Sequence, residues 1–240
     1  EEMQTARMLA DAHYNSGMLF KKRDETEMSI EHFERALDLA KKCDGESTSI
    51  LEATITDNLG MLHASKSDFV LAKKYYSSAY SAYENTFGRD DLRTSDCAFR
   101  LGVVLEELES NLALDFYKES LRVRKLHIVD DDERAAETLF YIARLLLKRD
   151  DHQNAVVCLE ESLDSRKRLF DDCFVVAETY HAIGKAYCEM SQGEKALIFY
   201  RESVRINKKV RNEDALYKVS LDMVSLFNTY CMGEIRFPDN

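Results

Sequence analysis

Apolar residues recur at helical spacing along most of the 240-residue chain, and polar clusters separate the apolar stretches. Side chains three, four and seven residues apart share one face of a helix, so each stretch predicts an amphipathic helix. Carboxylates precede four of these stretches, at Asp90-Asp91, Asp130 to Glu133, Asp150-Asp151 and Asp171-Asp172. They suit helix N-termini, where they meet free N–H groups and the positive end of the helix dipole. We predict helices over residues 4–22, 27–43, 49–66, 68–86, 92–108, 110–126, 132–148, 151–168, 174–190, 193–209 and 213–231.

Five segments of this pattern align on small residues. The first helix of each segment carries one, and their separations are 43, 42, 41 and 41 residues: Gly17, Gly60, Gly102, Ala143 and Gly184. The second helix carries two small residues seven apart with a larger apolar residue between them: Ser29/Phe33/Ala36, Ala72/Tyr76/Ala79, Ala113/Tyr117/Ser120, Ala155/Leu159/Ser162 and Ala196/Tyr200/Ser203. Small side chains let two helices approach closely, and the larger residue fills the space beside them. One such pair cannot bury its apolar face alone, so neighbouring pairs are expected to stack.

This spacing resembles the tetratricopeptide repeat, and the 41–43-residue period is similar to the kinesin light chain type. The fifth segment carries the resemblance most fully, through Tyr180, Ile183, Gly184, Tyr187, Ala196, Tyr200 and Ser203. It implies an all-α, right-handed superhelical solenoid of five helix–turn–helix repeats with a capping helix. We expect a single domain over residues 1–235, because no Pro-, Gly- or Ser-rich linker divides it. The predicted repeats are 8–46, 49–88, 92–128, 132–170 and 174–211, followed by the capping helix 213–231 and a tail 232–240.

Three departures from the family pattern accompany the resemblance. The third repeat is one residue shorter between Gly102 and Ala113, and the fourth has Ala143 where glycine is usual. The proline that often ends such a repeat is absent, and Pro238 is the single proline of the chain.

Composition narrows the class of function. The net charge of −11 argues against a general nucleic-acid binder, whose affinity needs clustered Lys and Arg. No apolar run approaches the ~18 residues of a membrane span. Six cysteines without a CxxC pair favour reduced thiols, so a reducing, cytoplasmic setting is the default expectation. The chain begins with glutamate rather than methionine, which indicates a fragment and leaves an upstream targeting segment open.

Catalytic motifs are missing from the sequence. It contains no phosphate-binding glycine loop, HExxH or GxSxG pattern, and no glycine turn that would make Asp130 to Glu133 a calcium loop. Cys188 lies seven residues from His181, but no orienting third group accompanies this pair. We therefore expect no enzyme activity, no cofactor and no metal site.

The resemblance implies that the first helices line a concave face that binds a partner. Residues three before, two before and one after each small residue are the candidates: Tyr14, Asn15 and Met18; Asp57, Asn58 and Met61; Phe99, Arg100 and Val103; Phe140, Tyr141 and Arg144; His181, Ala182 and Lys185. Asn58 matches an asparagine that many peptide-binding members carry, and its amide suits a peptide backbone. Aromatic and cationic side chains predict a protein or peptide partner with acidic and apolar side chains. The predicted function is a non-enzymatic scaffold or adaptor that binds this partner in the groove.

Several alternatives stay open at this level. The alternative for Phe99, Phe140 and Tyr141 is helix packing, and for His181 it is a plain structural role. The alternative for Arg100 and Arg144 is pairing with Glu106, Glu107 or Glu137. A chaperone-type carboxylate clamp is not favoured, because Tyr14 and Met18 stand where its lysine and asparagine would be. The whole chain is alternatively a structural subunit buried in a large assembly, or it self-associates through its terminal helices.

Overall fold

The computed structural model describes residues 2–43, 46–127, 133–210 and 215–231, and every regular element in these ranges is an α-helix. The chain divides into two compact units, Glu1–His127 and Ile128–Asn240. The boundary falls between the third and fourth repeats. A single continuous domain over residues 1–235 therefore stays a prediction.

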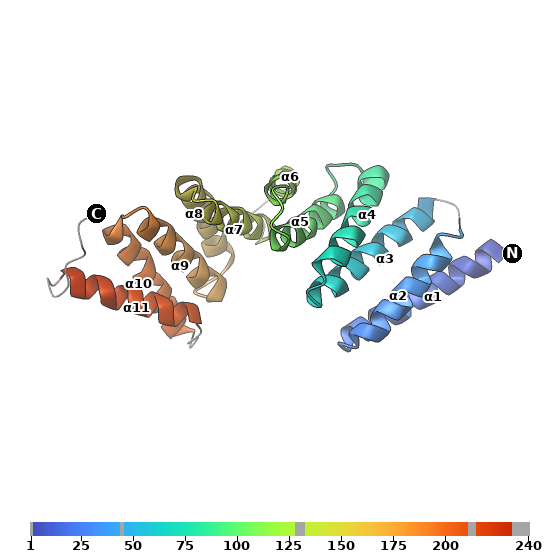
Figure 1. Ribbon diagram of the computed structural model, residues 1–240, viewed down its shortest axis with the longest axis horizontal. Helices are drawn as coiled ribbons and strands as arrows, with labels where there is room; N and C mark the ends of the chain where they lie inside the picture. The colour runs from blue at the N-terminus through green and yellow to red at the C-terminus, as the bar shows by residue number, and fades with distance from the viewer. Residues whose placement is uncertain (1, 44–45, 128–132, 211–214, 232–240) are drawn as a thin grey trace. The chain divides into compact units, whose positions relative to one another are not determined.

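The first unit contains three helix pairs (Figure 1). Its helices are α1 (Glu2–Lys22), α2 (Thr26–Ala40), α3 (Glu46–Ser65), α4 (Phe69–Phe87), α5 (Leu92–Glu107) and α6 (Ala113–Leu126). Each helix packs most extensively against the other helix of its own repeat, and the pairs then stack on their neighbours. The predicted helix–turn–helix repeats are thereby confirmed.

The second unit contains two further pairs and a last helix. Its helices are α7 (Glu133–Lys148), α8 (His152–Leu169), α9 (Phe174–Glu189), α10 (Gly193–Lys209) and α11 (Ala215–Cys231). The capping helix α11 packs mainly on α10 and also contacts α9. All predicted helices exist, and their described ends differ from the predicted ones by no more than three residues. The predicted tail 232–240 lies outside the described residues.

A large apolar side chain sits directly on the small residue of each first helix. A Cβ atom added to Gly60 would lie 2.7 Å from the ring of Tyr76, and one added to Gly102 would lie 2.7 Å from Tyr117. A Cβ atom added to Gly17 would lie 2.9 Å from the ring of Phe33, and one added to Gly184 would lie 3.0 Å from the ring of Tyr200. The small residues of the second helices that flank these rings are fully buried. Close approach of the two helices therefore depends on glycine at this position.

The fourth repeat solves the same contact differently. Ala143 replaces glycine, and the facing residue is Leu159 rather than an aromatic; both are fully buried in one apolar cluster. A leucine side chain leaves the space that a ring would fill, so the extra methyl group fits. The departure of this repeat from the family pattern is thus a matched pair of changes.

The turn inside each repeat uses one backbone conformation five times. Asp24, Ser67, Glu109, Asp150 and Ser191 have φ between 52° and 60°, in the left-handed region. Each lies seven residues after the small residue of its repeat. Polar non-glycine residues accept this conformation at a modest cost, and it reverses the chain within three to five residues.

The predicted carboxylate caps are confirmed in part. Asp91 accepts a hydrogen bond from the backbone N–H of Arg93 at 2.8 Å, and Asp151 accepts one from Asn154 at 3.4 Å. Asp172 does not cap its helix, because its carboxylate is bound by Arg205 and Lys209 of α10 at 3.0 and 2.9 Å. The cluster at Asp130 to Asp132 lies outside the described residues.

Gly60→Ala should lower the free energy of unfolding by about 1–2 kcal/mol, because overpacking against buried Tyr76 outweighs the ~1 kcal/mol gain in helix propensity. In a Tyr76→Leu background the same substitution should be neutral or stabilising, as in the fourth repeat. A urea-unfolding cycle of the two single variants and the double variant measures this coupling. Equal effects of Gly60→Ala in both backgrounds would show that the ring does not set the helix spacing.

Candidate functional site

The first helices α1, α3 and α5 carry the candidate residues of the first unit. Tyr14 and Met18 pack partly against the apolar cluster of the first two repeats, and the Tyr14 ring lies 5.8 Å from that of Phe33. Met61 is half-buried, and Asn15 is exposed. Asn15 is thus the one exposed side chain among these four.

Asn58 is buried, and its amide is already used inside the chain. Its Nδ2 donates to the backbone oxygen of Thr54, and its Oδ1 accepts from Lys21 Nζ, both at 2.8 Å. Burial lowers the pKa of Lys21, which the nearby Asp57 carboxylate partly offsets. A peptide backbone would have to displace Lys21 to reach the Asn58 oxygen.

Arg100 makes a two-point ion pair with Asp57 of the preceding first helix. Its Nε and Nη2 donate to the two carboxylate oxygens at 3.0 and 2.7 Å. The side chains are 29% and 13% exposed, so the pair is largely withdrawn from water. Burial raises the pKa of Asp57, and the Arg100 charge acts against that shift. The internal partner of Arg100 is therefore Asp57, not the glutamates considered from the sequence.

Phe99 and Phe140 are held by the same contact in two repeats. The guanidinium of Arg124 lies 4.7 Å from the ring centroid of Phe99, and that of Arg166 lies 4.7 Å from Phe140. Each arginine follows the last small residue of its second helix by four positions, at Ser120 and Ser162. The rings of Phe99 and Phe140 thus pack against arginines within the chain.

Arg166 also ties two repeats together. Its Nη1 donates to the backbone oxygen of Val175 at 3.0 Å and to Thr179 Oγ1 at 2.6 Å. In the other unit Arg124 donates to Asp96 at 2.8 Å. The candidates derived from first helices alone omitted both arginines, although their shared position in the repeat is visible in the sequence.

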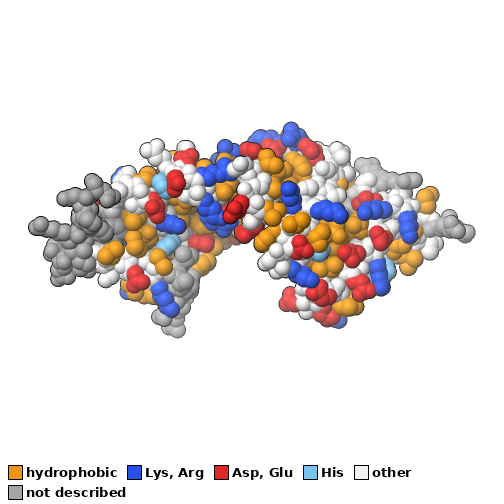
Figure 2. Space-filling view, viewed as in Figure 1, with side chains coloured by type: hydrophobic (Ala, Val, Ile, Leu, Met, Phe, Trp, Pro, Cys, Tyr) orange, Lys and Arg blue, Asp and Glu red, His pale blue; other side chains and the backbone are white. Residues whose placement is uncertain are grey.

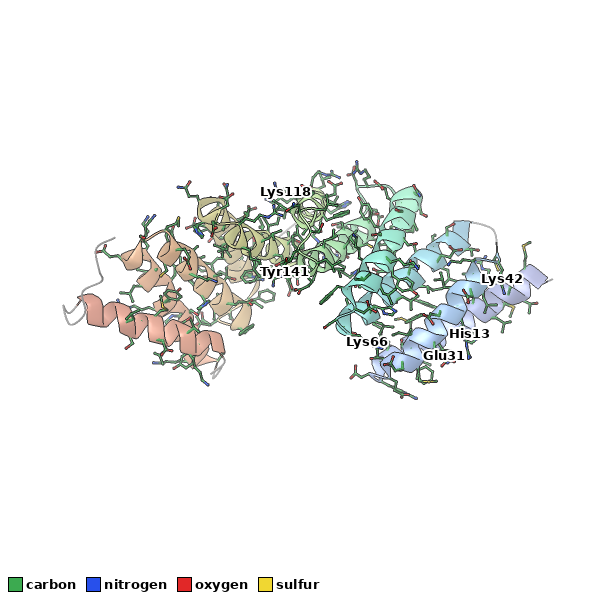
Figure 3. All side chains as sticks on the ribbon, in the orientation of Figure 1. His13, Glu31, Lys42, Lys66, Lys118 and Tyr141 are labelled. Carbon is green, nitrogen blue, oxygen red and sulfur yellow. The ribbon has the colours of Figure 1, made fainter. Side chains whose placement is uncertain are left out.

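A cavity of about 410 Å³ opens between α7, α8 and α9 in the second unit. Five residues from the predicted set line it: Phe140, Arg144, His181, Ala182 and Lys185. Leu147 and Leu159 extend its apolar wall, and Lys148 and Glu178 add charge. The Arg144 guanidinium lies 4.3 Å from the ring centroid of Tyr141, which projects from α7 (Figure 3). The structure therefore gathers the predicted residues of α7 and α9 around one hollow, except Tyr141, which is not part of the lining.

Two charged residues of this cavity were missed from the sequence. Lys148 follows Arg144 by four residues, and Glu178 precedes Lys185 by seven. Both spacings keep side chains on one helix face. Extending the predicted face by one turn in each direction would have found them.

His181 is buried and well connected rather than a free acid or base. Its Nδ1 lies 2.6 Å from Ser220 Oγ, and its ring meets Tyr200 edge-on at 5.4 Å between centroids. Burial raises the pKa of the Cys188 thiol, which disfavours the reactive thiolate. Among the described residues, no group of three or more His, Cys, Asp or Glu side chains is arranged to hold a metal ion.

Charge on the surface is mixed. Figure 2 shows acidic and basic side chains interspersed with apolar ones on the visible face of each unit. In the part of the chain that the structure describes, no helix combines the length and apolarity needed to cross a membrane. The cysteines at positions 43, 97, 158, 173 and 188 are free thiols.

The Asp57–Arg100 pair should be energetically coupled. Removing either partner leaves the other charge partly buried, so we expect a coupling energy of about 1–2 kcal/mol, below the ~3–5 kcal/mol of a fully buried pair. Urea unfolding of Asp57→Ala, Arg100→Ala and the double variant measures it. The exposed pair Glu31–Arg35 of α2 is the matched control and should couple by less than ~0.5 kcal/mol. Additive effects at Asp57 and Arg100 would contradict the expectation.

Comparison with known proteins agrees with the geometry of the repeats. A curated relative, Response regulator aspartate phosphatase A of Bacillus subtilis (strain 168), is 26% identical over 197 residues, which cover 80% of this chain and 48% of the relative. The chain thus spans about half the length of that relative.

Two solved structures share the fold. One, described as a kinesin light chain of Podosopora anserina with nearly identical repeats, has a TM-score of 0.69 at 12% identity, over 85% of this chain and 97% of that chain. The other is YrrB, described as a tetratricopeptide repeat protein with an unusual peptide-binding site. It has a TM-score of 0.62 at 19% identity, over 88% of this chain and 90% of that chain. The predicted resemblance to the kinesin light chain type is confirmed at the level of fold.

Family models give the assignment. A model described as Tetratricopeptide repeat matches residues 51–125 and 134–209, and a second model of the same description matches residues 10–43. The first model alone covers more than half of the chain, and the protein therefore belongs to the tetratricopeptide repeat family.

Proposed function

We propose that the chain is a non-enzymatic scaffold that binds an extended segment of a partner protein along its first helices. The family consists typically of interaction modules, and YrrB is described as having a peptide-binding site. The observation that carries the proposal is the cavity of the second unit, because it unites residues from two successive first helices. Cavities of this volume commonly bind one or a few side chains of a ligand.

The lining of the cavity favours an apolar side chain next to a carboxylate. Phe140, Leu147, Leu159 and Ala182 supply apolar surface. Arg144, Lys148 and Lys185 place three cationic side chains around it, against the single carboxylate of Glu178. The lining residues thus carry more positive than negative charge, although the whole chain has a net charge of −11. A partner segment with leucine- or phenylalanine-like and acidic residues fits both features.

The first unit contributes less charge to this proposal than the sequence indicated. The Arg100 guanidinium is engaged by Asp57, and both ends of the Asn58 amide are engaged by Thr54 and Lys21. Contacts there would come mainly from Tyr14, Asn15, Met18 and Met61. The cavity lies in the second unit, and we place the energetic anchor of the partner there.

Catalysis is not part of the proposal. The relative from Bacillus subtilis is named a phosphatase, but its identity of 26% and coverage of 48% of its length do not carry an activity to this chain. His181 bonds to the Ser220 hydroxyl, but Ser220 is fully buried and is not part of the cavity lining, so this pair does not face a ligand. Binding by itself accounts for the residues that gather there.

The test is a selection of 12-residue peptides on the intact chain, followed by fluorescence anisotropy of the selected peptides at two salt concentrations. We expect enrichment of acidic residues beside a large apolar residue. Arg144→Ala and Lys185→Ala should each weaken binding about threefold to tenfold, with smaller salt dependence, because a screened charge contact is lost. Ala182→Phe should block binding by filling the cavity.

The matched controls are Lys167→Ala and Lys208→Ala, which remove equal charge from exposed positions away from the cavity. They should change affinity by less than about twofold. Circular dichroism checks that every variant is folded. Selected peptides that bind all variants equally would place the binding surface elsewhere on the molecule.

A further inference from the structure

The last helix, α11, reaches the cavity through one buried side chain. His181 lines the cavity from α9, and its Nδ1 lies 2.6 Å from Ser220 Oγ of α11. Ser220 is fully buried, and its hydroxyl also bonds to Ser203 Oγ of α10 at 3.3 Å. Three helices therefore meet at the back of one wall of the cavity.

Hydrogen bonds on both sides of the Ser220 hydroxyl hold the His181 ring. Ser220 Oγ lies 3.3 Å from Ser203 Oγ and 2.6 Å from His181 Nδ1, and the tautomer of the ring decides which group donates in the shorter bond. An imidazole held at Nδ1 has a defined ring plane, and packing against Tyr200 restrains the same plane from the other helix.

Among the described side chains, α10 and α11 meet through the polar pair Ser203 and Ser220, unlike the ring-on-glycine contacts within the repeats. Next to Ser203 on α10, Asn207 is buried, and its Oδ1 finds no hydrogen-bond partner among the described residues. On α11 itself, Val219, Leu221 and Leu226 are exposed. A buried polar contact stabilises helix docking less than a close-packed apolar contact. Docking of α11 therefore depends in part on the hydrogen bond between Ser220 and His181.

We propose that α11 is a positioning element for the cavity: Ser220 holds the His181 ring in place, and docking of α11 and occupation of the cavity strengthen each other. This inference rests on the proposed function for its second half only. A ligand that contacts the held His181 ring favours the docked state of α11. By thermodynamic reciprocity, docked α11 then favours the ligand by the same factor.

The first experiment needs no ligand. Hydrogen–deuterium exchange of residues 217–226 is measured in the full chain for the wild type, Ser220→Ala, His181→Asn and His181→Gln. Asparagine can present its amide near the Nδ1 position, whereas glutamine presents it near Nε2. We expect exchange of α11 to rise about threefold to tenfold in Ser220→Ala and His181→Gln, the effect of losing one hydrogen bond, and to stay within twofold of the wild type in His181→Asn.

The control is Asp222→Asn, a change on the exposed side of α11 that should leave the exchange unchanged. A merely space-filling His181 would make the Asn and Gln variants alike, and such a result would overturn the proposal. So would unchanged exchange in Ser220→Ala. Exchange of α7 and α8 in the same samples shows that the unit remains folded.

The second experiment uses a peptide selected on the intact chain. Its binding should slow exchange of residues 217–226, and Ser220→Ala should weaken its affinity about threefold to tenfold while the effect of Lys185→Ala persists. Protection of α9 alone, with unchanged affinity in Ser220→Ala, would refute the coupling. Failure to select any peptide would count against the proposed function, whereas the ligand-free exchange would still decide the role of Ser220.

Discussion

The contact between a large apolar side chain and a small residue of the facing helix is the constraint on which each helix pair depends. At Gly60 and Gly102 the facing tyrosine lies so close that even a methyl group would collide with it. The contact fixes the separation of the two helices, and with it the direction in which the first helix presents its remaining side chains. The fourth repeat shows that the constraint is on combined volume, because Ala143 is matched by Leu159. Candidate binding residues one to three positions away are therefore placed by packing that they do not themselves provide.

Most of the fold was predictable because this constraint requires small and large residues at fixed spacing, and that spacing is visible in the sequence. Small residues, rings and their period gave the helices, their pairing and the family. The left-handed turn residues were equally periodic, seven positions after each small residue, but Glu109 and Asp24 carry no glycine signal that marks them. The buried arginines 124 and 166 were missed for a related reason: in a single sequence a charged residue near the end of a helix is typical of solvent exposure. Only the structure shows that both stack on the phenylalanines of their own repeats.

The candidate site was predictable in position but not in pairing. Helical spacing placed Arg100, Arg144 and Lys185 on first helices, yet it does not say which charges meet across repeats. Asp57 and Arg100 are 43 residues apart in the sequence and bond at two points, because successive first helices lie side by side. Spacing within one helix favours partners on that helix, and for this reason the glutamates near Arg100 were considered and Asp57 was not. Pairing between repeats depends on stacking geometry that a single sequence does not encode directly.

The two units also differ in the side chains that a partner would meet on the first helices. In the first unit Arg100 is engaged by Asp57 and Lys21 by Asn58, so a carboxylate that approaches either cation would have to compete with an internal bond. In the second unit no aspartate stands at the position of Asp57: the equivalent residues in the fourth and fifth repeats are Phe140 and His181. Both border the cavity and add ring surface to its lining. A carboxylate at this position is confined to the second repeat, because the first and third repeats carry Tyr14 and Phe99 there; the rings of the fourth and fifth repeats supply wall surface to the cavity.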